Sequence, residues 1–172
     1  MVWSLVAVGI VVGRGMRPML ERATGRGLGW VAAQVLLMAA VAVLGPSSVG
    51  GWRGWVTAGL AVALVAVGAY LGIAGVLALG PHRTIFPQPL AGSKLVQDGV
   101  YGCVRHPLYT SVGCLALGWG LWWGSGPALA ATAVLIAFLG CKSAREEVWL
   151  RERFPEYDAY ARRVKRLIPW VY

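Results

Sequence analysis

Residues 107–141 read PLYTSVGCLALGWGLWWGSGPALAATAVLIAFLGC and form the longest uncharged run of the chain. The run has 35 positions without Asp, Glu, Lys or Arg, whereas one helix needs only about 20 apolar residues to cross a bilayer. The sequence GSGP at residues 124–127 interrupts the run with a strong turn signal. We therefore predict a hairpin of two transmembrane helices, the second of which continues past Cys141 into the charged segment that follows.

Three more apolar runs precede this hairpin. Residues 28–52 and 54–81 contain no charged side chain and are long enough to span a membrane. Residues 1–13 are apolar but of marginal length; no basic residue precedes them and no clear cleavage site follows, which favours a short first span over a secretory signal. With 58% hydrophobic and 13% charged residues, the chain departs from the usage of soluble proteins. We predict an all-α integral membrane protein with about five transmembrane helices.

The distribution of basic residues predicts the orientation in the membrane. Of the 16 Lys and Arg residues, 15 fall on one side of the predicted spans and only Arg53 falls on the other. The positive-inside rule makes the basic side cytoplasmic and places the amino terminus outside. Contact with anionic lipid headgroups explains the net charge of +9. Because the basic residues flank spans, nucleic acid is not a predicted partner.

The cysteines and histidines do not form a recognisable pattern. Cys103, Cys114 and Cys141, with His82 and His106, have neither the spacing of a disulfide framework nor that of a zinc site. We therefore predict no bound metal, and we expect the cysteines to act as small apolar residues in or near helices.

The two halves of the chain differ in chemistry. Residues 1–80 form three spans of Val, Ala, Leu and Gly, in which Gly68 and Gly72 have the four-residue spacing that lets helices pack closely. Residues 81–172 contain both histidines and most of the charged side chains, in a proline-rich cytoplasmic loop, the hairpin, and two charged helical stretches separated by Pro155. We predict that any catalytic chemistry lies in this second region.

The last charged stretch has a helical pattern. Apolar side chains recur in it at helical spacing, opposite a set of arginines. The apolar set is Tyr157, Tyr160, Val164 and Leu167, and the basic set is Arg162, Arg163 and Arg166. This pattern predicts an amphipathic helix that lies on the membrane surface.

Arg105, His106 and Pro107 stand directly before the hairpin. Proline is favoured in the first turn of a helix, so we predict that His106 caps the helix and that its free N–H groups form an anion site. Arg105 beside it suits a carboxylate or phosphate. Tyr109 falls on about the same helix face as His106, and Tyr101 lies in the preceding turn. The spacing alone fits equally well an interfacial girdle, in which Arg reaches headgroups and Tyr lies at the boundary.

Glu146 and Glu147 lie on the helix that leaves the membrane. Acidic residues near a bilayer are costly unless they have partners; Lys142 lies one turn before Glu146, and Arg151 one turn after Glu147. Ordinary ion pairing on a solvated helix explains the two carboxylates on their own. Together with the helix start at His106, they would also accept hydrogen bonds from a ligand that has an amino acid end and a sugar end.

Two segments resemble a known family: SKLVQDGVYGCVRHPLYTSVG, residues 93–113, and REEVWLRERFPEYDAYARRVKRLIP, residues 145–169. With the hairpin between them, they are similar to the isoprenylcysteine carboxyl methyltransferase and phospholipid methyltransferase superfamily of integral membrane enzymes, over residues 79–172. The resemblance implies an enzyme that binds S-adenosylmethionine at the cytoplasmic face, in a pocket closed by the carboxy-terminal helix, and methylates a lipophilic acceptor from the bilayer. The loop LGPHRTIFPQP is more similar to bacterial members, which implies a bacterial inner membrane.

The resemblance also implies which residues form the site. The implied cofactor contacts are Lys94, Leu95, Val96, Tyr101, His106, Pro107, Leu108, Tyr109 and Glu146, with Glu147 and Arg105 in support. In the carboxyl methyltransferases, a basic residue one turn before the acidic pair faces the substrate carboxylate. Lys142 holds that place here, and Arg145 is the second candidate. Lysine cannot make the bidentate contact of arginine, which weakens the case for a prenylcysteine carboxylate as the acceptor.

The chemistry of the acceptor stays open between O-, N- and S-methylation, as does the oligomeric state. Methyl transfer is an in-line displacement that depends mainly on positioning. A carboxylate acceptor needs no base, whereas an amine does, and His106, Glu146 and Glu147 are then the candidates.

Two other functions are alternatives to methyl transfer. One is a membrane reductase that uses a nicotinamide cofactor on a related helical scaffold. The other is a non-enzymatic protein, such as a channel, a transporter subunit or an assembly factor. The non-enzymatic alternative predicts polar residues near mid-span, and the chain offers few besides Gln34, Thr57 and Thr132.

Overall fold

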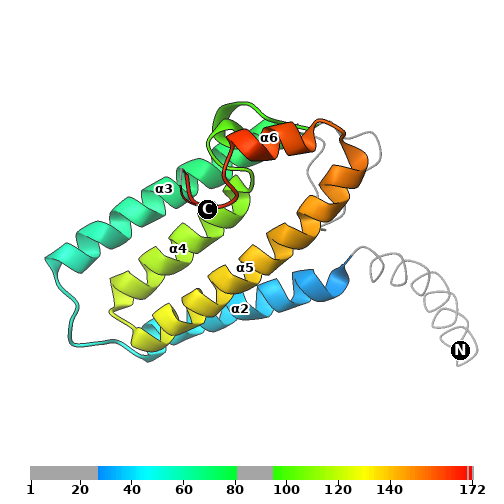
Figure 1. Cartoon of the computed structure of the whole chain (residues 1–172). Helices are drawn as coiled ribbons and strands as arrows, with labels where there is room; N and C mark the ends of the chain where they lie inside the picture. The colour runs from blue at the N-terminus through cyan, green and yellow to red at the C-terminus, as the bar shows by residue number, and fades with distance from the viewer. Residues whose placement is uncertain (1–26, 81–94, 170, 172) are drawn as a thin grey trace, which may run out of the picture.

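The described part of the chain is helical. A computed structural model (Figure 1) describes residues 27–80, 95–169 and 171. Within these residues there are five α-helices and one 3-10 helix, and the one β-type contact is an isolated bridge between Val104 and Lys165. The helices are α2 (Leu28–Ser47), α3 (Trp55–Leu79), the 3-10 helix η2 (Gly99–Gly102), α4 (Pro107–Trp123), α5 (Gly126–Arg153) and α6 (Tyr157–Arg163). The all-α prediction is confirmed for this part of the chain.

Three of these helices are candidate membrane spans. By length and composition, α2, α3 and α5 can cross a bilayer. α4 has 17 residues, somewhat fewer than the roughly 20 of a full crossing. The predicted first span, residues 1–13, lies outside the described residues. The structure therefore supports a membrane protein with three candidate spans, and the total of five stays a prediction.

The helical hairpin is confirmed, with its turn at the predicted place, and the membrane crossing of its first arm, α4, stays a prediction. Gly124 caps α4 with a φ of 61°, in the left-handed region that glycine favours. Ser125 caps α5: its hydroxyl accepts a hydrogen bond from the Ala128 N–H at 3.1 Å and donates one to the Leu44 carbonyl of α2 at 2.8 Å. As predicted, α5 continues through the charged segment that follows the uncharged run.

α4 is the central helix of the bundle and contacts α2, α3 and α5 (Figure 1). Its contact with α3 is close because glycines lie between the two backbones. A Cβ atom at Gly68 would lie 3.0 Å from the Ser111 carbonyl oxygen, and one at Gly72 would lie 2.7 Å from the Ser111 hydroxyl. From the α4 side, a Cβ atom at Gly118 would lie 2.9 Å from the Ala61 carbonyl oxygen. The close packing predicted from Gly68 and Gly72 is confirmed.

The buried apolar core lies between α2, α4 and α5. It consists of Val41, Ala116, Leu135 and Leu139. Large apolar side chains are exposed on α2 and α3, among them Leu36, Trp55 and Leu77. Exposed apolar surface of this kind marks a face that contacts a membrane or a partner.

The segment after α6 differs from the prediction. α6 ends at Arg163, and Val164 is extended, with φ −115° and ψ 133°. The chain then runs beside the residues that precede α4, where the Arg105 N–H donates to the Lys165 carbonyl at 2.8 Å. The predicted amphipathic helix through Leu167 is therefore wrong beyond Arg163, because these backbone groups bond to another segment instead of continuing the helix.

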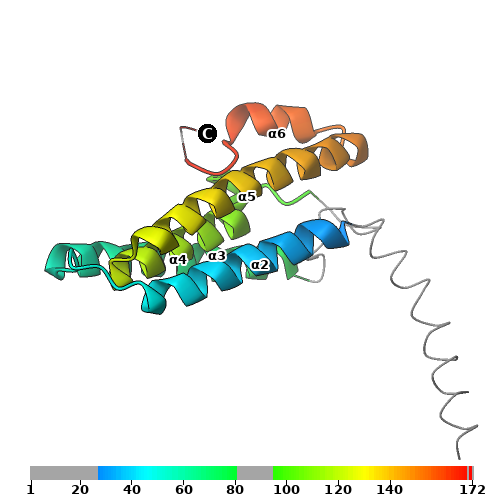
Figure 2. The same cartoon turned by 90° about the horizontal axis from the view of Figure 1, so that it is seen from below.

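The apolar side chains of this C-terminal region are covered by protein. Tyr157, Tyr160 and Val164 form a buried cluster, against which Leu95, Leu150, Phe154 and Ala161 pack. Figure 2 shows α6 over the end of α5, on the side away from α2. The prediction that this apolar face contacts the membrane surface is wrong for these three side chains. Their burial brings the C-terminal segment to the start of α4.

Candidate functional site

Most of the predicted site residues meet at one end of the bundle. The start of α4, the charged part of α5 and the segment after α6 come together there (Figure 1). His106 is the N-cap residue of α4 and Pro107 is its first residue, as predicted. Of the predicted cofactor contacts, Lys94 lies outside the described residues.

Three of these residues form a connected polar group. The Nδ1 atom of His106 lies 3.4 Å from the Oε2 atom of Glu146. The Tyr109 hydroxyl donates a hydrogen bond to the other oxygen of Glu146. The His106 and Tyr109 rings stack with their centroids 5.6 Å apart. His106 is buried, whereas 14% of the Glu146 side chain is exposed and Tyr109 is half-buried, so Glu146 and Tyr109 are the members of the group that reach the surface.

Glu147 has different surroundings from its neighbour. Its side chain is fully buried and is contacted by three guanidinium groups, those of Arg105, Arg151 and Arg166. Arg105 donates to Oε1 at 2.8 and 3.0 Å, and Arg166 donates to Oε1 at 2.9 Å and to Oε2 at 3.0 Å. The Nε2 atom of His106 lies 3.3 Å from Oε1, but it is not aligned for a hydrogen bond. Glu147 is thus the centre of an internal ion cluster.

The Arg105 side chain donates all its hydrogen bonds in this structure to groups of the protein itself. Besides this carboxylate, its Nη1 atom donates to the carbonyl of Ala161 at 2.9 Å and to that of Val164. The His106 N–H also has a protein partner, the Arg166 carbonyl at 3.1 Å. The groups from which the sequence predicted an anion site therefore bind the C-terminal segment in this structure.

The remaining predicted cofactor contacts line different parts of this region. Tyr101 is buried, and its carbonyl accepts a hydrogen bond from the Tyr160 hydroxyl at 2.6 Å. Leu95 packs against the buried tyrosine cluster of the C-terminal region, and Val96 beside it is half-buried.

Pro107 and Leu108 pack toward α3. A Cβ atom at Gly75 of α3 would lie 2.9 Å from the Leu108 side chain and 3.5 Å from that of Pro107. These two residues hold the start of α4 against α3, and the structure does not bring their side chains to Glu146.

The two predicted substrate residues lie apart. Lys142 is buried, and its Nζ atom donates to the Gln34 side-chain oxygen of α2 at 2.6 Å and lies 5.2 Å from the centre of the Tyr109 ring. Lys142 therefore has Gln34 as its hydrogen-bond partner, in place of the predicted ion pair with Glu146. Arg145 is exposed and stacks on Trp149, with its guanidinium carbon 5.2 Å from the ring centre.

The carboxylates determine the protonation of His106. Burial opposes the charged form of the imidazole, but the interactions with Glu146 and Glu147 outweigh it and raise the pKa of His106 above its ordinary value of 6.5. The two carboxylates therefore favour the protonated form of His106, whose Nδ1 atom faces Glu146.

Two residues of the site were missed by the analysis of the sequence. Gln34 was noted only as an isolated polar residue in an apolar span, and Arg166 only as part of the basic face of a helix. Neither has a local signal, because their partners are 108 and 19 residues away along the chain.

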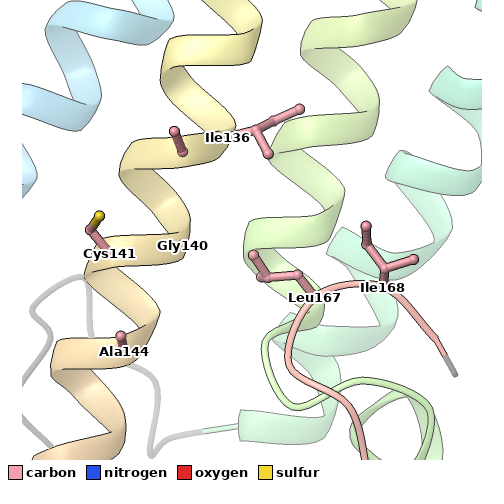
Figure 3. Close-up of a pocket in the computed structure, with 7 residues that line it drawn as sticks. Ile136, Gly140, Cys141, Ala144, Leu167 and Ile168 are labelled. Carbon is pink, nitrogen blue, oxygen red and sulfur yellow. The ribbon is translucent and has the colours of Figure 1, made fainter. Parts of the chain in front are cut away.

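An apolar groove of about 370 Å³ lies between α5 and the C-terminal segment (Figure 3). α5 contributes Ile136, Ala137, Gly140, Cys141 and Ala144 to its lining, and the C-terminal segment contributes Leu167 and Ile168. Leu167 follows Arg166 directly, and its carbonyl accepts a hydrogen bond from the Thr110 hydroxyl of α4 at 2.7 Å. One wall of the groove is therefore fixed to the first turn of α4.

The described residues hold no candidate metal site. Among them, no group of three or more His, Cys, Asp or Glu side chains is placed to bind a metal ion. The three cysteines are free thiols. The polar atoms available to a ligand in this region are therefore those of carboxylate, imidazole, hydroxyl and basic side chains.

Comparison with known proteins identifies one family. The family model described as phospholipid methyltransferase matches residues 56–157. This range covers more than half of the chain, from the first turn of α3 to the first residue of α6, and includes His106, Tyr109 and both carboxylates of α5. No curated protein and no solved structure matches the chain.

Proposed function

The chain belongs to the phospholipid methyltransferase family, and we propose that it is an integral membrane enzyme that transfers a methyl group from S-adenosylmethionine to a lipophilic acceptor. The observation that carries this proposal is the polar group of His106, Tyr109 and Glu146 at the start of α4. It stands at the start of an uncharged helix, and α5, which carries Glu146, also lines an apolar groove. We propose that the polar cofactor binds at this group and that the apolar acceptor approaches along α5.

The residues present suit this cofactor. S-adenosylmethionine has an ammonium, a carboxylate, ribose hydroxyls and a sulfonium. A carboxylate has about four acceptor positions, and the contacts of Glu146 with Tyr109 and His106 leave room for the ammonium or the hydroxyls. The imidazole of His106, when protonated, suits the cofactor carboxylate. Lys94, Leu95, Val96 and Tyr101 are proposed to complete the pocket, with Pro107 and Leu108 as the support of the helix start.

When bound, this cofactor supplies an electrophilic methyl group for in-line displacement. The part of the protein is to hold the acceptor in line with that methyl group and to keep water out. For an acceptor that must lose a proton, Glu146 is the best-placed base. Both carboxylates raise the pKa of His106 and so favour its protonated form, and the charge of Glu147 is compensated by three guanidinium groups.

The acceptor is proposed to place its apolar part in the groove beside α5. The groove is lined by aliphatic side chains and by Cys141, which suits a lipid chain or another hydrophobic group. Of the two basic residues, Lys142 is proposed to contact the polar end of the acceptor, because it lies over the Tyr109 ring, whereas Arg145 lies over Trp149.

The same proposal assigns the topology. We infer five spans, with the amino terminus outside and the site at the cytoplasmic face of a bacterial inner membrane. Residues 1–80 would form the membrane scaffold, and residues 81–172 would form the catalytic region. The asymmetry of the basic residues supports this orientation. The hydrogen bonds between the C-terminal segment and the start of α4 support its role in closing the cofactor pocket.

Binding of S-adenosylhomocysteine, the product of the cofactor, tests the proposal. We expect the detergent-purified protein to bind it with micromolar affinity by calorimetry. The variant Glu146→Gln should bind about tenfold to a hundredfold more weakly, because a hydrogen bond to a charged group contributes about 1.5–3 kcal/mol. Glu152→Gln is the matched control: it makes the same change at an exposed position of α5 and should bind like the wild type. A folded wild-type protein that does not bind would contradict the cofactor assignment.

A further inference from the structure

The two adjacent carboxylates of α5 have unequal surroundings. Glu146 is 14% exposed and has Tyr109 and His106 as partners, whereas Glu147 is fully buried among guanidinium groups. A buried carboxylate with several charged donors is a fixed structural element, because each donor offsets part of the cost of burying the charge in a medium of low dielectric. The two carboxylates therefore have different tasks.

Arg166 is the donor that comes from the C-terminal segment. Its guanidinium reaches both oxygens of Glu147, with Nε at 2.9 Å from Oε1 and Nη2 at 3.0 Å from Oε2. This two-point contact fixes orientation as well as distance, which a single charge does not do. The backbone supports it, since the Arg166 carbonyl accepts from the His106 N–H at 3.1 Å. Arg166 thus contacts His106 through its backbone and Glu147 through its side chain.

His106 stands between the two carboxylates. The groups that face it are Glu146 and Glu147 of α5, at 3.4 and 3.3 Å, the Tyr109 ring of α4, the neighbouring Arg105, and the Arg166 carbonyl. With Arg105 and Arg166 compensating Glu147, the nearest carboxylate still in need of a donor is Glu146. Without Arg166, the charge of Glu147 would compete for the imidazolium.

We propose that Arg166 is a positioning residue, which holds Glu147 in the internal ion cluster. His106 is thereby directed to Glu146, and of the two carboxylates only Glu146 remains to bind the ligand. The part that concerns the ligand rests on the proposed function. The assignment separates Glu147 from the cofactor contacts implied by the family resemblance, and it adds a residue that lies beyond the range of the family match.

The first test measures His106 without any ligand. The chain has two histidines, His82 and His106, so the imidazole signals of histidine-labelled protein can be assigned with the variant His82→Gln. Arg166→Gln should raise the NMR titration midpoint of His106 by about one pH unit, a tenfold change in proton affinity, because the imidazole loses a nearby cation and faces a less compensated carboxylate. Arg162→Gln removes an arginine from an exposed position of α6 and should leave the midpoint unchanged.

The second test measures binding of S-adenosylhomocysteine. Arg166→Gln should weaken it about tenfold, and Arg166→Lys should restore part of the affinity, since lysine keeps the charge but not the two-point contact. If Arg166→Gln does not fold, the His106 titration and the ligand affinity are both measured on Arg166→Lys. Its titration midpoint should be near that of the wild type, and its affinity should lie between those of the wild type and Glu146→Gln.

The outcomes separate this inference from the proposed function. A folded Arg166→Gln variant with an unchanged midpoint overturns the positioning role, even if its melting temperature falls, because a merely structural residue would lower stability alone. A shifted midpoint with unchanged ligand affinity also overturns it. If the wild type binds no S-adenosylhomocysteine, the proposed function fails, and the titration midpoint alone then decides whether Arg166 directs His106.

Discussion

The helical bundle and its polar end are held together by different means. In the bundle, α3 and α4 approach closely through Gly68, Gly72 and Gly118, and α2 packs on α5 through aliphatic side chains. At the polar end, the start of α4, the charged part of α5 and the C-terminal segment are joined by an ion cluster around Glu147 and by backbone hydrogen bonds. The bundle depends on shape, whereas the polar end depends on compensated charge.

This difference divides the molecule into a scaffold and a site. Apolar packing between helices is tolerant of changes that conserve volume, and it places no reactive group. A buried charge cluster is costly to assemble and sensitive to the loss of any member. A protein that keeps such a cluster at the end of an apolar bundle uses it to hold specific side chains in place, and here those side chains are His106 and Glu146.

The largest effect is expected from removing the centre of the cluster. Glu147→Gln leaves the guanidinium groups of Arg105 and Arg166 without their carboxylate in a buried place, and the loss of one partner of a buried ion pair costs about 3–5 kcal/mol. We expect the free energy of unfolding in mixed micelles to fall by about this amount. The exposed Glu152→Gln should change it by less than about 0.5 kcal/mol. Equal effects of the two variants would show that the polar end is not held by charge.

A smaller effect is expected from overfilling the contact between α3 and α4. At Gly118, a Cβ atom would lie 2.9 Å from the Ala61 carbonyl oxygen and from a Val65 methyl group, so Gly118→Val should lower the free energy of unfolding by about 1–3 kcal/mol. Gly59→Val, where nothing lies within 4 Å of an added Cβ atom, is the control. If the bundle is held by close approach, the two variants should differ clearly in thermal unfolding.

The smallest effect is expected from the protonation of His106. Because its pKa is raised in the folded protein, its charged form adds stability that is complete below about pH 6.5, the ordinary value, and is lost as the pH rises through the raised value. Each unit of difference contributes about 1.4 kcal/mol. The free energy of unfolding should therefore fall as the pH rises above about 6.5.

The variant His106→Gln isolates this contribution. It has no imidazole to titrate, so the part of the pH dependence that belongs to His106 should be absent. A wild-type protein and a His106→Gln variant with the same loss of stability over this range would show that the imidazole is not held by Glu146 and Glu147.

The bundle could be predicted from the sequence because its signals are local. The uncharged run and the turn at residues 124–127 gave the hairpin, Pro107 gave the start of α4, and the glycine spacing gave the close contact with α3. Each of these depends on residues within a few positions of one another, which is the range over which helical periodicity and turn chemistry act.

The organisation of the polar end could not be predicted, because its partners are distant in the chain. The spacing of Lys142 and Glu146 predicted an ion pair, but the ammonium bonds to Gln34, 108 residues away. The pattern after Pro155 predicted a helix through Leu167, but carbonyl groups of the C-terminal segment accept hydrogen bonds from Arg105, 56 and 59 residues away. The family resemblance named both carboxylates of α5 and could not show that one of them is enclosed by arginines.

Transfer of a labelled methyl group is the most direct measurement of the central claim, that the polar end and the adjoining groove form one methyltransferase site. The purified protein would be returned to bilayers made from a native membrane lipid extract and incubated with S-adenosylmethionine labelled in its methyl group. The lipids are then extracted into organic solvent and their label is measured. The account predicts labelled lipid extract with the wild type and with Glu152→Gln, and at least about tenfold less label with Glu146→Gln. Equal labelling by the wild type and Glu146→Gln, or no labelling by a folded wild type that binds S-adenosylhomocysteine, would contradict it.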